Sequence, residues 1–433
     1  MARPRKNAPK PNTQELSLVP VEEQPYPLPE GWKWVRLGDV AHWGSGGTPS
    51  RKIPSYYNGT IPWIKTGELM DDYIFSSEEY ITEEGLNNSS AKIFPKDTVI
   101  IAMYGATIGK TAILGVPAST NQACACATSF LGKVKYLFYY LHSEKDNFIK
   151  KAKGGAQPNI SQDVIKKCLI PLPPLDEQER IVTRIESLFA KLDEAKEKAE
   201  SVLDSYETRK AAILHKAFTG ELTAKWRGER GIKKESWKQN SIASLCHSLK
   251  YGTAKKSKEN GPVVVLRMGN LQAGEIDWGS LAYSDDQEDI QKYLLTAGDV
   301  LFNRTNSAEL VGKTSIYRGE YPAIYAGYLI KMDYKKDVLT GPFLNYVMNS
   351  QKAKAYCNAV KSDGVNQSNI NAKKLGAFII PVPPLPEQQE ITRILDSLLE
   401  KEQQSKEVAE TVLEQIDLMK KAILAKAFRG ELG

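Results

Sequence analysis

The chain has 433 residues, of which 41% are hydrophobic and 25% are charged, and its formal net charge at pH 7 is +6. These values are typical of a folded chain with several domains, and neither a membrane-spanning apolar run nor a signal-peptide core is recognisable. Among the five cysteines, Cys124 and Cys126 alone lie close together, which argues against a disulfide framework and against a zinc site. We therefore expect reduced thiols and a cytoplasmic protein. The small basic excess is compatible with a nucleic-acid partner but does not require one.

Residues 1–30 are rich in Pro, Lys, Arg and Asn and contain few side chains that a core would bury. We predict a flexible basic tail for this segment. Its cations are Arg3, Arg5, Lys6 and Lys10, and solvation is a more common fate for such charges than contact with a polyanion.

A first globular segment covers residues 31–174. Short β-type runs, such as 98–102, alternate in it with Gly, Pro and Asn turns, and residues 134–151 contain a helical periodicity. This mixture predicts an α+β domain.

A long helix is predicted at 175–222. It follows the string Ile-Pro-Leu-Pro-Pro-Leu-Asp-Glu-Gln-Glu at 170–179, whose prolines cannot lie inside a helix. Asp176 and Glu177 then suit the positive end of the helix dipole, and Gly220 stands where a C-terminal cap belongs. Apolar side chains recur every three or four residues, which is the pattern of a coiled-coil seam. They are Ile181, Ile185, Leu188, Leu192, Ala195, Ala199, Val202 and Tyr206.

After a linker at 223–234, the same order of segments returns. A second globular segment covers 235–384 and a second long helix covers 385–433. The string Ile-Pro-Val-Pro-Pro-Leu-Pro-Glu-Gln-Gln at 380–389 repeats the helix entry at an offset of 210 residues, and the endings at 212–222 and 422–432 match at the same offset. The globular segments share only scattered matches, such as Lys65 with Arg267. This long period indicates a duplicated domain rather than a solenoid.

The second helix has a less regular apolar seam. We expect it to contain Ile394, Leu398, Val408, Val412 and Met419, with interruptions at Lys401, Ser405 and Gln415. Because an isolated amphipathic helix would expose its apolar stripe, we expect the two helices to cover each other. The order head–helix–head–helix therefore predicts two similar globular heads joined by an antiparallel coiled coil, with an internal pseudo-twofold repeat.

The motif search finds no chemistry that both heads share. The segment 105–111, Gly-Ala-Thr-Ile-Gly-Lys-Thr, has one residue fewer between its glycines than a phosphate-binding loop requires, and 308–314 lacks the first glycine. We interpret both as turns between strands. Neither a nucleophile with a base nor a carboxylate pair occurs in both heads, so we predict no catalytic, metal or cofactor site.

Polar and basic residues do fall in matching loops, which favours contact with DNA. Arg and Lys suit guanine edges and phosphates, Asn suits adenine, and Tyr adds apolar contact or a phosphate hydrogen bond. For any one residue, a solvated loop charge remains an equally good explanation. The residues that we assign to DNA binding are Arg51, Lys52, Tyr56, Lys65, Tyr104, Lys255, Lys256, Arg267, Asn270, Asn303, Arg304 and Asn306.

From about residue 31 to the end, the chain resembles the specificity (S) subunit of type I restriction-modification systems. The resemblance rests on the Pro-Leu-Pro-Pro-Leu-x-Glu-Gln helix entry, on the paired Ala-Phe-x-Gly-Glu-Leu endings and on the two divergent heads. It implies that the heads are target recognition domains, each of which reads one half of a split, asymmetric sequence in double-stranded DNA. It also implies that the helices set the distance between the heads and bind two modification (M) subunits.

The same resemblance implies that the chemistry lies in the partners. The M subunits would bind S-adenosylmethionine and methylate adenine, and restriction (R) subunits would use ATP and Mg for translocation and cleavage. The S subunit would bind no cofactor and have no catalytic residue. Two other functions remain open from the residues alone: a stand-alone nuclease or methyltransferase with duplicated domains, and a coiled-coil adaptor without a DNA role.

Overall fold

The computed structural model describes residues 17–152, 158–365 and 367–432 of the chain. The chain divides into two compact units, one formed by Met1–Lys198 with Thr411–Gly433 and the other by Ala199–Glu410. We call them unit 1 and unit 2. Each combines a globular head with part of both long helices, so the fold is α+β with duplicated heads and two antiparallel helices, as the sequence predicts.

The head of unit 1 (head 1, residues 33–172) is closed at its base by a short antiparallel pair, β1 (Lys33–Arg36) with β11 (Leu169–Leu172). Its main sheet has the order β2-β10-β7-β8-β4, and a second sheet has the order β5-β3-β9-β6. These strands are β2 (His42–Ser45), β3 (Tyr57–Ile64), β4 (Tyr73–Ile74), β5 (Tyr80–Ile81), β6 (Ile93–Phe94), β7 (Val99–Ala102), β8 (Thr111–Leu114), β9 (Ala118–Thr120) and β10 (Cys124–Thr128).

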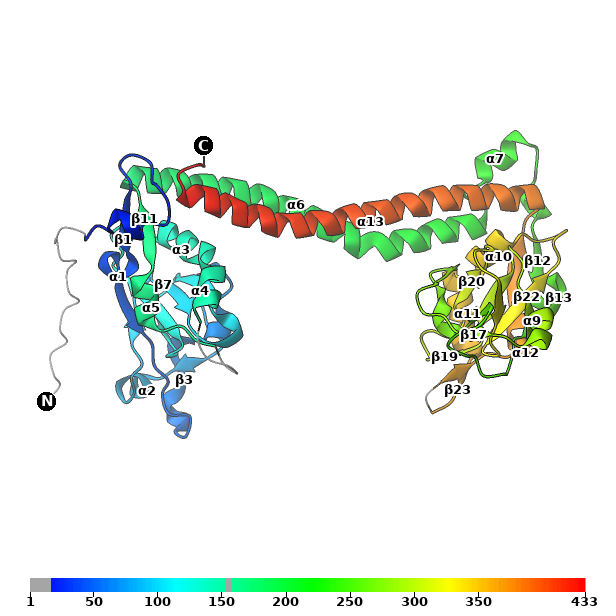
Figure 1. The fold of residues 1–433 in the computed structure, drawn as a ribbon, viewed down its shortest axis with the longest axis horizontal. Coiled ribbons are helices and arrows are strands. Elements are labelled where there is room, and N and C mark those ends of the chain that lie inside the picture. Colours follow the sequence, from blue (N-terminus) through cyan, green and yellow to red (C-terminus); the bar gives the residue numbers. More distant parts are fainter. Residues whose placement is uncertain (1–16, 153–157, 366, 433) are drawn as a thin grey trace. The chain divides into compact units, whose positions relative to one another are not determined.

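Short helices cover the sheets of head 1, and α3 lies between the main sheet and the long helices (Figure 1). Its Leu137 and Leu141 are fully buried against strand residues such as Ile101, while Tyr136 stacks edge-on against Phe428 at a centroid distance of 5.3 Å. The predicted helical pattern at 134–151 is therefore two helices. The helices and 3-10 turns are η1 (Val21–Glu23), α1 (Leu37–Val40), η2 (Pro54–Tyr56), η3 (Thr66–Glu68), α2 (Glu83–Asn87), η4 (Gly105–Thr107), α3 (Val134–Ser143), α4 (Lys145–Lys151) and α5 (Gln162–Lys167).

The head of unit 2 (head 2, residues 238–382) repeats this plan with different loops. An antiparallel pair, β12 with β25, again closes the base, and the sheets have the orders β13-β22-β18-β20, β17-β14-β21, β15-β16 and β19-β24-β23. The strands are β12 (Lys238–Ser241), β13 (Cys246–Tyr251), β14 (Val263–Leu266), β15 (Leu271–Gln272), β16 (Glu275–Ile276), β17 (Tyr283–Ser284), β18 (Val300–Asn303), β19 (Thr305–Asn306), β20 (Thr314–Ile316), β21 (Ala323–Tyr325), β22 (Leu329–Tyr334), β23 (Ser362–Asp363), β24 (Ser368–Asn369) and β25 (Ile379–Val382).

Helix α10 of unit 2 takes the place that α3 has in unit 1, between the main sheet and the long helices. The helices and 3-10 turns of unit 2 are α7 (Ala224–Glu229), η5 (Lys234–Ser236), α8 (Ile242–Leu245), η6 (Met268–Asn270), α9 (Gln287–Tyr293), α10 (Gly341–Met348), α11 (Gln351–Val360) and α12 (Ala372–Gly376). One match is shared by the central strands: β3 pairs parallel with β9, and β14 pairs parallel with β21.

The two long helices are α6 (Leu175–Thr219) and α13 (Leu385–Phe428), close to the predicted bounds. Each is followed by a glycine with positive φ, Gly220 at 83° and Gly430 at 74°, so both predicted caps are confirmed. In unit 1 the start of α6 packs with the end of α13, and Lys420 bonds Asp193 at 2.6 Å. In unit 2 the end of α6 packs with the start of α13, and Arg209 bonds Glu402 at 2.7 Å.

A buried glutamine at each helix entry fastens the helix to its head. Gln388 is fully buried, and its amide nitrogen donates to the carbonyls of Pro383 and Val338 at 2.8 Å while its oxygen accepts from the Thr340 backbone at 2.9 Å. Gln178 does the same in unit 1, donating to Pro173 and accepting from Lys133, both at 2.9 Å. The glutamine of the repeated string is therefore a clamp on the N-cap residue of α3 or α10.

The predicted seam of α13 is wrong in phase beyond Leu398. Val408 and Met419 are 62% and 47% exposed, whereas Ala409 and Ile416 are buried in their place. Lys401, Ser405 and Gln415 interrupt the apolar pattern, so the pattern does not show which positions of α13 are buried. In addition, a helix of 3.6 residues per turn drifts relative to a seven-residue pattern.

Part of the predicted tail is packed. Residues 1–16, with their four cations, lie outside the described residues, but Val19 is 5% exposed and its backbone bonds that of Trp34. Tyr26 donates to the carbonyl of Phe428 at 3.0 Å, at the end of α13. The contact of Tyr26 joins residues 402 positions apart, which no local pattern reveals.

The predicted linker after α6 likewise belongs to the core of unit 2. Arg227 of α7 is 8% exposed and forms an ion pair with fully buried Glu387. Glu387 also accepts from Thr223 at 2.7 Å and from the Trp237 indole at 2.9 Å. The acidic residue at the entry of α13 therefore holds three elements together, beyond its favourable place on the helix dipole.

The clamp makes a quantitative prediction. Gln388→Ala should lower the free energy of unfolding by about 2–4 kcal/mol, because it leaves the Thr340 N–H and two carbonyls buried without partners. Gln404→Ala, on the exposed face of the same helix, is the matched control and should change it by less than about 0.5 kcal/mol. Urea unfolding of the full chain measures both. Equal effects would show that the buried amide is not a clamp.

Candidate nucleic-acid interface

A loop follows the second strand of each head, β2 or β13, and contains the candidates Arg51 and Lys52 in head 1 and Lys255 and Lys256 in head 2. The loop begins at Gly46 in head 1 and at Gly252 in head 2. A Cβ at either position would collide with a backbone carbonyl, that of Thr120 at the end of β9 or that of Tyr325 at the end of β21. Glycine is therefore required where this loop crosses the parallel strand pair.

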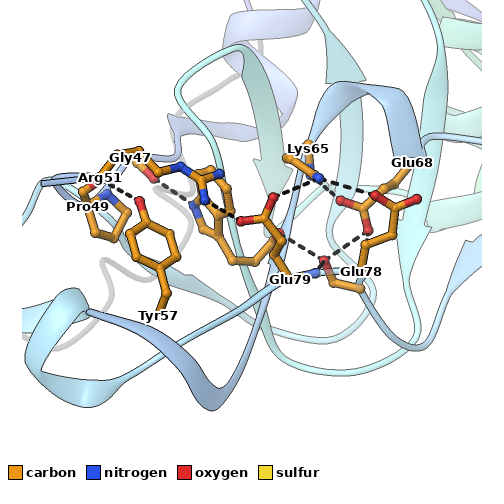
Figure 2. A network of polar contacts seen from close by, with 10 residues as sticks. Gly47, Pro49, Arg51, Tyr57, Lys65, Glu68, Glu78 and Glu79 are labelled. Carbon is orange, nitrogen blue, oxygen red and sulfur yellow. Dashed lines mark hydrogen bonds and ion pairs between the residues drawn. The ribbon is translucent and has the colours of Figure 1, made fainter. Parts of the chain in front are cut away.

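In head 1 this loop meets the end of β3 in a network of ions and rings (Figure 2). Arg51 Nη1 bonds Glu79 Oε2 at 2.6 Å, and Lys65 Nζ bonds Glu79 Oε1 at 2.9 Å. Lys65 also bonds Glu78 at 3.2 Å. We call Arg51, Lys65, Glu68, Glu78 and Glu79 the head 1 cluster. Two residues that the sequence suggests independently, Arg51 and Lys65, are thus joined through one carboxylate.

The cluster is fixed by the backbone around it. Glu68 accepts from the Lys65 backbone nitrogen at the start of η3, and its other oxygen accepts from Ser77 and from the Glu78 backbone, all at 2.9 Å. The Ser77 hydroxyl also lies 2.9 Å from the Trp63 carbonyl. The segment that carries Glu78 and Glu79 therefore cannot move independently of the end of β3.

The ion pairs determine the charge state of the cluster. The hydrogen bond from Arg51, followed by the one from Lys65, lowers the pKa of Glu79 to about 2. The same contacts raise the pKa of Arg51 and the pKa of Lys65 above their ordinary values. Because this carboxyl pKa is lowered in the folded state, the ion pairs of Glu79 add to the free energy of unfolding at neutral pH. This stabilisation is lost as the pH falls below the ordinary pKa of a glutamate toward 2.

Head 2 arranges its cations differently. Lys255 lies near the N-terminus of α9, 2.8 Å from Asp286 and 3.5 Å from Asp289, and Lys258 lies 2.7 Å from Asp285. Arg267, the counterpart of Lys65, is exposed, and among the described residues its guanidinium has one long contact, of 3.5 Å, to the Ser280 carbonyl. The equivalent position is thus an ion pair in head 1 and a nearly free guanidinium in head 2.

Three candidates lie in the interior and position other groups. Asn270 is 3% exposed, accepts from the Arg267 backbone and donates to the carbonyls of Asp277 and Ser280, all at 2.9 Å. Asn303 is fully buried and contacts the Met268 carbonyl at 3.4 Å, and Tyr56 is 9% exposed. These side chains have no exposed edge to offer to a base. Their polarity suggested an interface, whereas the hydrogen bonds of Asn270 and Asn303 belong to the fold and Tyr56 is buried.

Tyr104, Arg304 and Asn306 lie in a second region, just after β7 in head 1 and β18 in head 2. Tyr104 is 45% exposed and pairs by a backbone bridge with Asn159. Arg304 stacks on Tyr251 at 4.8 Å and contacts the Gly327 carbonyl at 3.3 Å, and Asn306 pairs with Ser368. Lys52 and Lys256 are exposed in the first loop of each head.

The two segments that resemble a phosphate-binding loop connect neighbouring strands. The predicted turns are confirmed: β7 and β8 pair antiparallel around 105–111, and β18 and β20 do so around 308–314. No group of three or more His, Cys, Asp or Glu that would suit a metal ion occurs among the described residues. Likewise, none of the helices described is both long and apolar enough to pass through a membrane.

Comparison with known proteins gives the family. The model of the type I restriction modification DNA specificity domain matches residues 29–203 and again residues 234–412. The chain belongs to this family. It is similar to the specificity subunit of the type I restriction enzyme EcoKI from Escherichia coli K12, with 27% identity over 94% of this chain and 90% of that one. The StySPI specificity subunit from Salmonella potsdam has 26% identity over the same shares.

Solved structures show the same fold. The HsdS subunit from Thermoanaerobacter tengcongensis superposes with a TM-score of 0.67 at 21% identity, covering 95% of this chain and all of that chain. A chain from a study of the assembly and conformational transition of a type I R-M system gives 0.69 at 22% identity, over 94% of this chain. Both family-model matches begin in a head and end in a long helix, so the duplication deduced from the sequence is a duplication of this specificity domain.

Sequence reasoning missed the carboxylates of this specificity subunit, because it searched for cations and for acidic pairs shared by both heads. One signal was available. Glu68 stands three residues after Lys65, and Asn270 stands three residues after Arg267, which is the spacing at which the later side chain accepts from the backbone nitrogen of the earlier residue at a helix start. The spacing predicts that the third residue holds the turn and that the first projects from it.

We therefore expect Arg267 to contact DNA and Asn270 to stabilise the turn that carries Arg267. Arg267→Ala should leave the free energy of unfolding within about 0.5 kcal/mol of wild type and weaken DNA binding. Asn270→Ala removes three buried hydrogen bonds and should lower the free energy of unfolding by about 2–3 kcal/mol. Urea unfolding and a DNA titration of the two variants test the pair. Unchanged DNA binding by Arg267→Ala would place this loop away from the DNA.

Proposed function

We propose that this specificity subunit is a non-catalytic reader in which each head recognises one half of a split, asymmetric DNA sequence. The observation that carries the proposal is the contrast within the two units. The helix entries, the clamps and the strand pairs match, whereas the loops that hold Arg51, Lys65 and Arg267 differ in charge and in partners. A dimer of identical halves reads a palindrome, but a fused pair of diverged heads is free to read two different half-sites.

We further propose that the long helices bind two M subunits, to which R subunits add. The support lies on α13, where Val408, Leu418 and Met419 are 62%, 67% and 47% exposed. Leu418 and Met419 are adjacent in the chain, and exposed apolar side chains that join into one contiguous patch mark a protein–protein contact. Methylation would then use S-adenosylmethionine held by the M subunits, and translocation would use ATP and Mg held by the R subunits.

A selection from randomised duplexes tests the reading. The subunit, co-purified with its M subunits, should enrich two specific blocks separated by a spacer without preference. Arg267→Ala should relax the choice in one block alone, at a cost of about 1–3 kcal/mol for each lost base contact. A single continuous block, or relaxation in both blocks, would contradict one head per half-site.

Native mass spectrometry tests the assembly. The co-expressed complex should contain two M subunits for each chain. The double variant Leu418→Asp with Met419→Asp should stay folded, since both side chains are exposed, and should lose at least one M subunit. Ile416→Asp, which buries a charge at a position that is 3% exposed, should instead unfold the chain. A double variant that still binds two M subunits would exclude this face.

A further inference from the structure

We propose that Glu79 is a positioning residue that holds Arg51 in the orientation needed to read a guanine in the half-site of head 1, so that this loop contacts bases rather than phosphates. The inference deepens the proposed function and rests on it. It makes Arg51, rather than Lys65, the reader of the head 1 cluster.

The guanidinium of Arg51 is held on three sides (Figure 2). Its central carbon lies 4.4 Å from the ring centroid of Tyr57 and 5.1 Å from that of Trp63. The rings are themselves fixed, because the Tyr57 hydroxyl donates to the Pro49 carbonyl and the Trp63 indole donates to the Gly47 carbonyl at 2.9 Å. Glu79 then fixes the rotation of the guanidinium through Nη1. A side chain with several rotatable bonds is thus ordered before any ligand arrives.

The order of Arg51 leaves one edge available. Its side chain is 54% exposed, and among the described residues Glu79 is its hydrogen-bond partner, through Nη1. The Nε and Nη2 groups can therefore donate in parallel. Two parallel donors match the O6 and N7 acceptors of guanine in the major groove, and they also match a phosphate.

The charge of the cluster favours the base over the phosphate. Arg51 and Lys65 contribute two positive charges, against three negative charges from Glu68, Glu78 and Glu79, so the head 1 cluster has a formal charge of −1. A phosphate would approach this net negative charge, whereas a guanine is neutral. Glu78, with 73% of its side chain exposed, adds an acceptor that suits a base amino group and repels a phosphate.

Lys65 supports Glu79 and is poorly placed to act alone. Its ammonium group has carboxylate partners at 2.9 and 3.2 Å, and its side chain is 30% exposed. It holds the Glu79 oxygen that Arg51 does not use. Lys65 therefore keeps the carboxylate in place, and the carboxylate keeps Arg51 in place.

The test is a thermodynamic cycle on Glu79→Gln and Arg51→Ala in the full chain with its M subunits, with randomised-duplex selection and a salt titration as readouts. Glu79→Gln keeps the side-chain shape and removes the charge that orients Arg51. Glu83→Gln, an exposed residue of α2 with the same change in charge, is the control. Thermal unfolding of each variant checks the fold.

We expect Arg51→Ala to reduce the preference for guanine at one position of one block by about 5- to 150-fold, the range for a lost bidentate contact. Glu79→Gln should reduce the same preference at least about fivefold, the double variant should be no worse than Arg51→Ala, and the salt slope should not change. Since Glu79 stays ionised far below neutral pH, the wild-type preference should also be constant between pH 5 and pH 8.

Each other result is decisive. If Glu79→Gln behaves like Glu83→Gln while wild type shows a split preference, the positioning role is overturned and the proposed function stands. If the variants weaken all sequences evenly and lower the salt slope by about one, Arg51 contacts a phosphate and the inference is wrong. If Glu79→Gln does not fold, Arg51→Lys decides, because it keeps the charge and loses the paired donors. A wild-type complex without sequence preference overturns the proposed function itself.

Discussion

Neither head completes its hydrophobic core without both long helices, and the rest of the structure depends on this constraint. The core of unit 1 contains Ile185 of α6 and Phe428 of α13, and the core of unit 2 contains Leu214 of α6 and Ile391 of α13. Each helix thus begins in one core and ends in the other. A change in either helix must satisfy two packing problems at once, which explains why the helix entries and endings are the parts in which the two halves remain most alike.

The features that the two halves share constrain the structure only where each head joins the long helices. At the base of each head, the strand pairs β1–β11 and β12–β25 provide hydrogen-bond partners for the backbone, and Gln178 and Gln388 bond further backbone groups. Beyond the sheets, the loops have to satisfy only their own hydrogen bonds. Head 1 does so with glutamates on a loop before β5, and head 2 does so with aspartates at the start of α9. Two different solutions on one scaffold are what separate half-site recognition requires.

Several cations of the candidate interface are paired with carboxylates. Arg51, Lys65, Lys255 and Lys258 each have an acidic partner within 3 Å, so the modest net charge of the chain is further reduced where contact with DNA is proposed. Pairing weakens the long-range attraction of these cations to DNA but orders their side chains. An ordered guanidinium loses less rotamer entropy on binding than a free one. Such an interface is suited to distinguishing bases more than to general attraction for a polyanion.

The sequence by itself determined the duplication, the two long helices with their glycine caps, the α+β heads and the family. These features are local or repeated: proline strings, a three-to-four periodicity and a 210-residue offset can all be recognised without knowledge of contacts. Only the tertiary structure decided which candidates face outward. Asn270 and Asn303 have the composition of base readers but are buried, and the packing of Tyr26 on the end of α13 joins residues about 400 positions apart. Glu79 was invisible for the same reason, because its partners lie 28 and 14 residues away and a carboxylate acquires its role only from the cations that the fold brings to it.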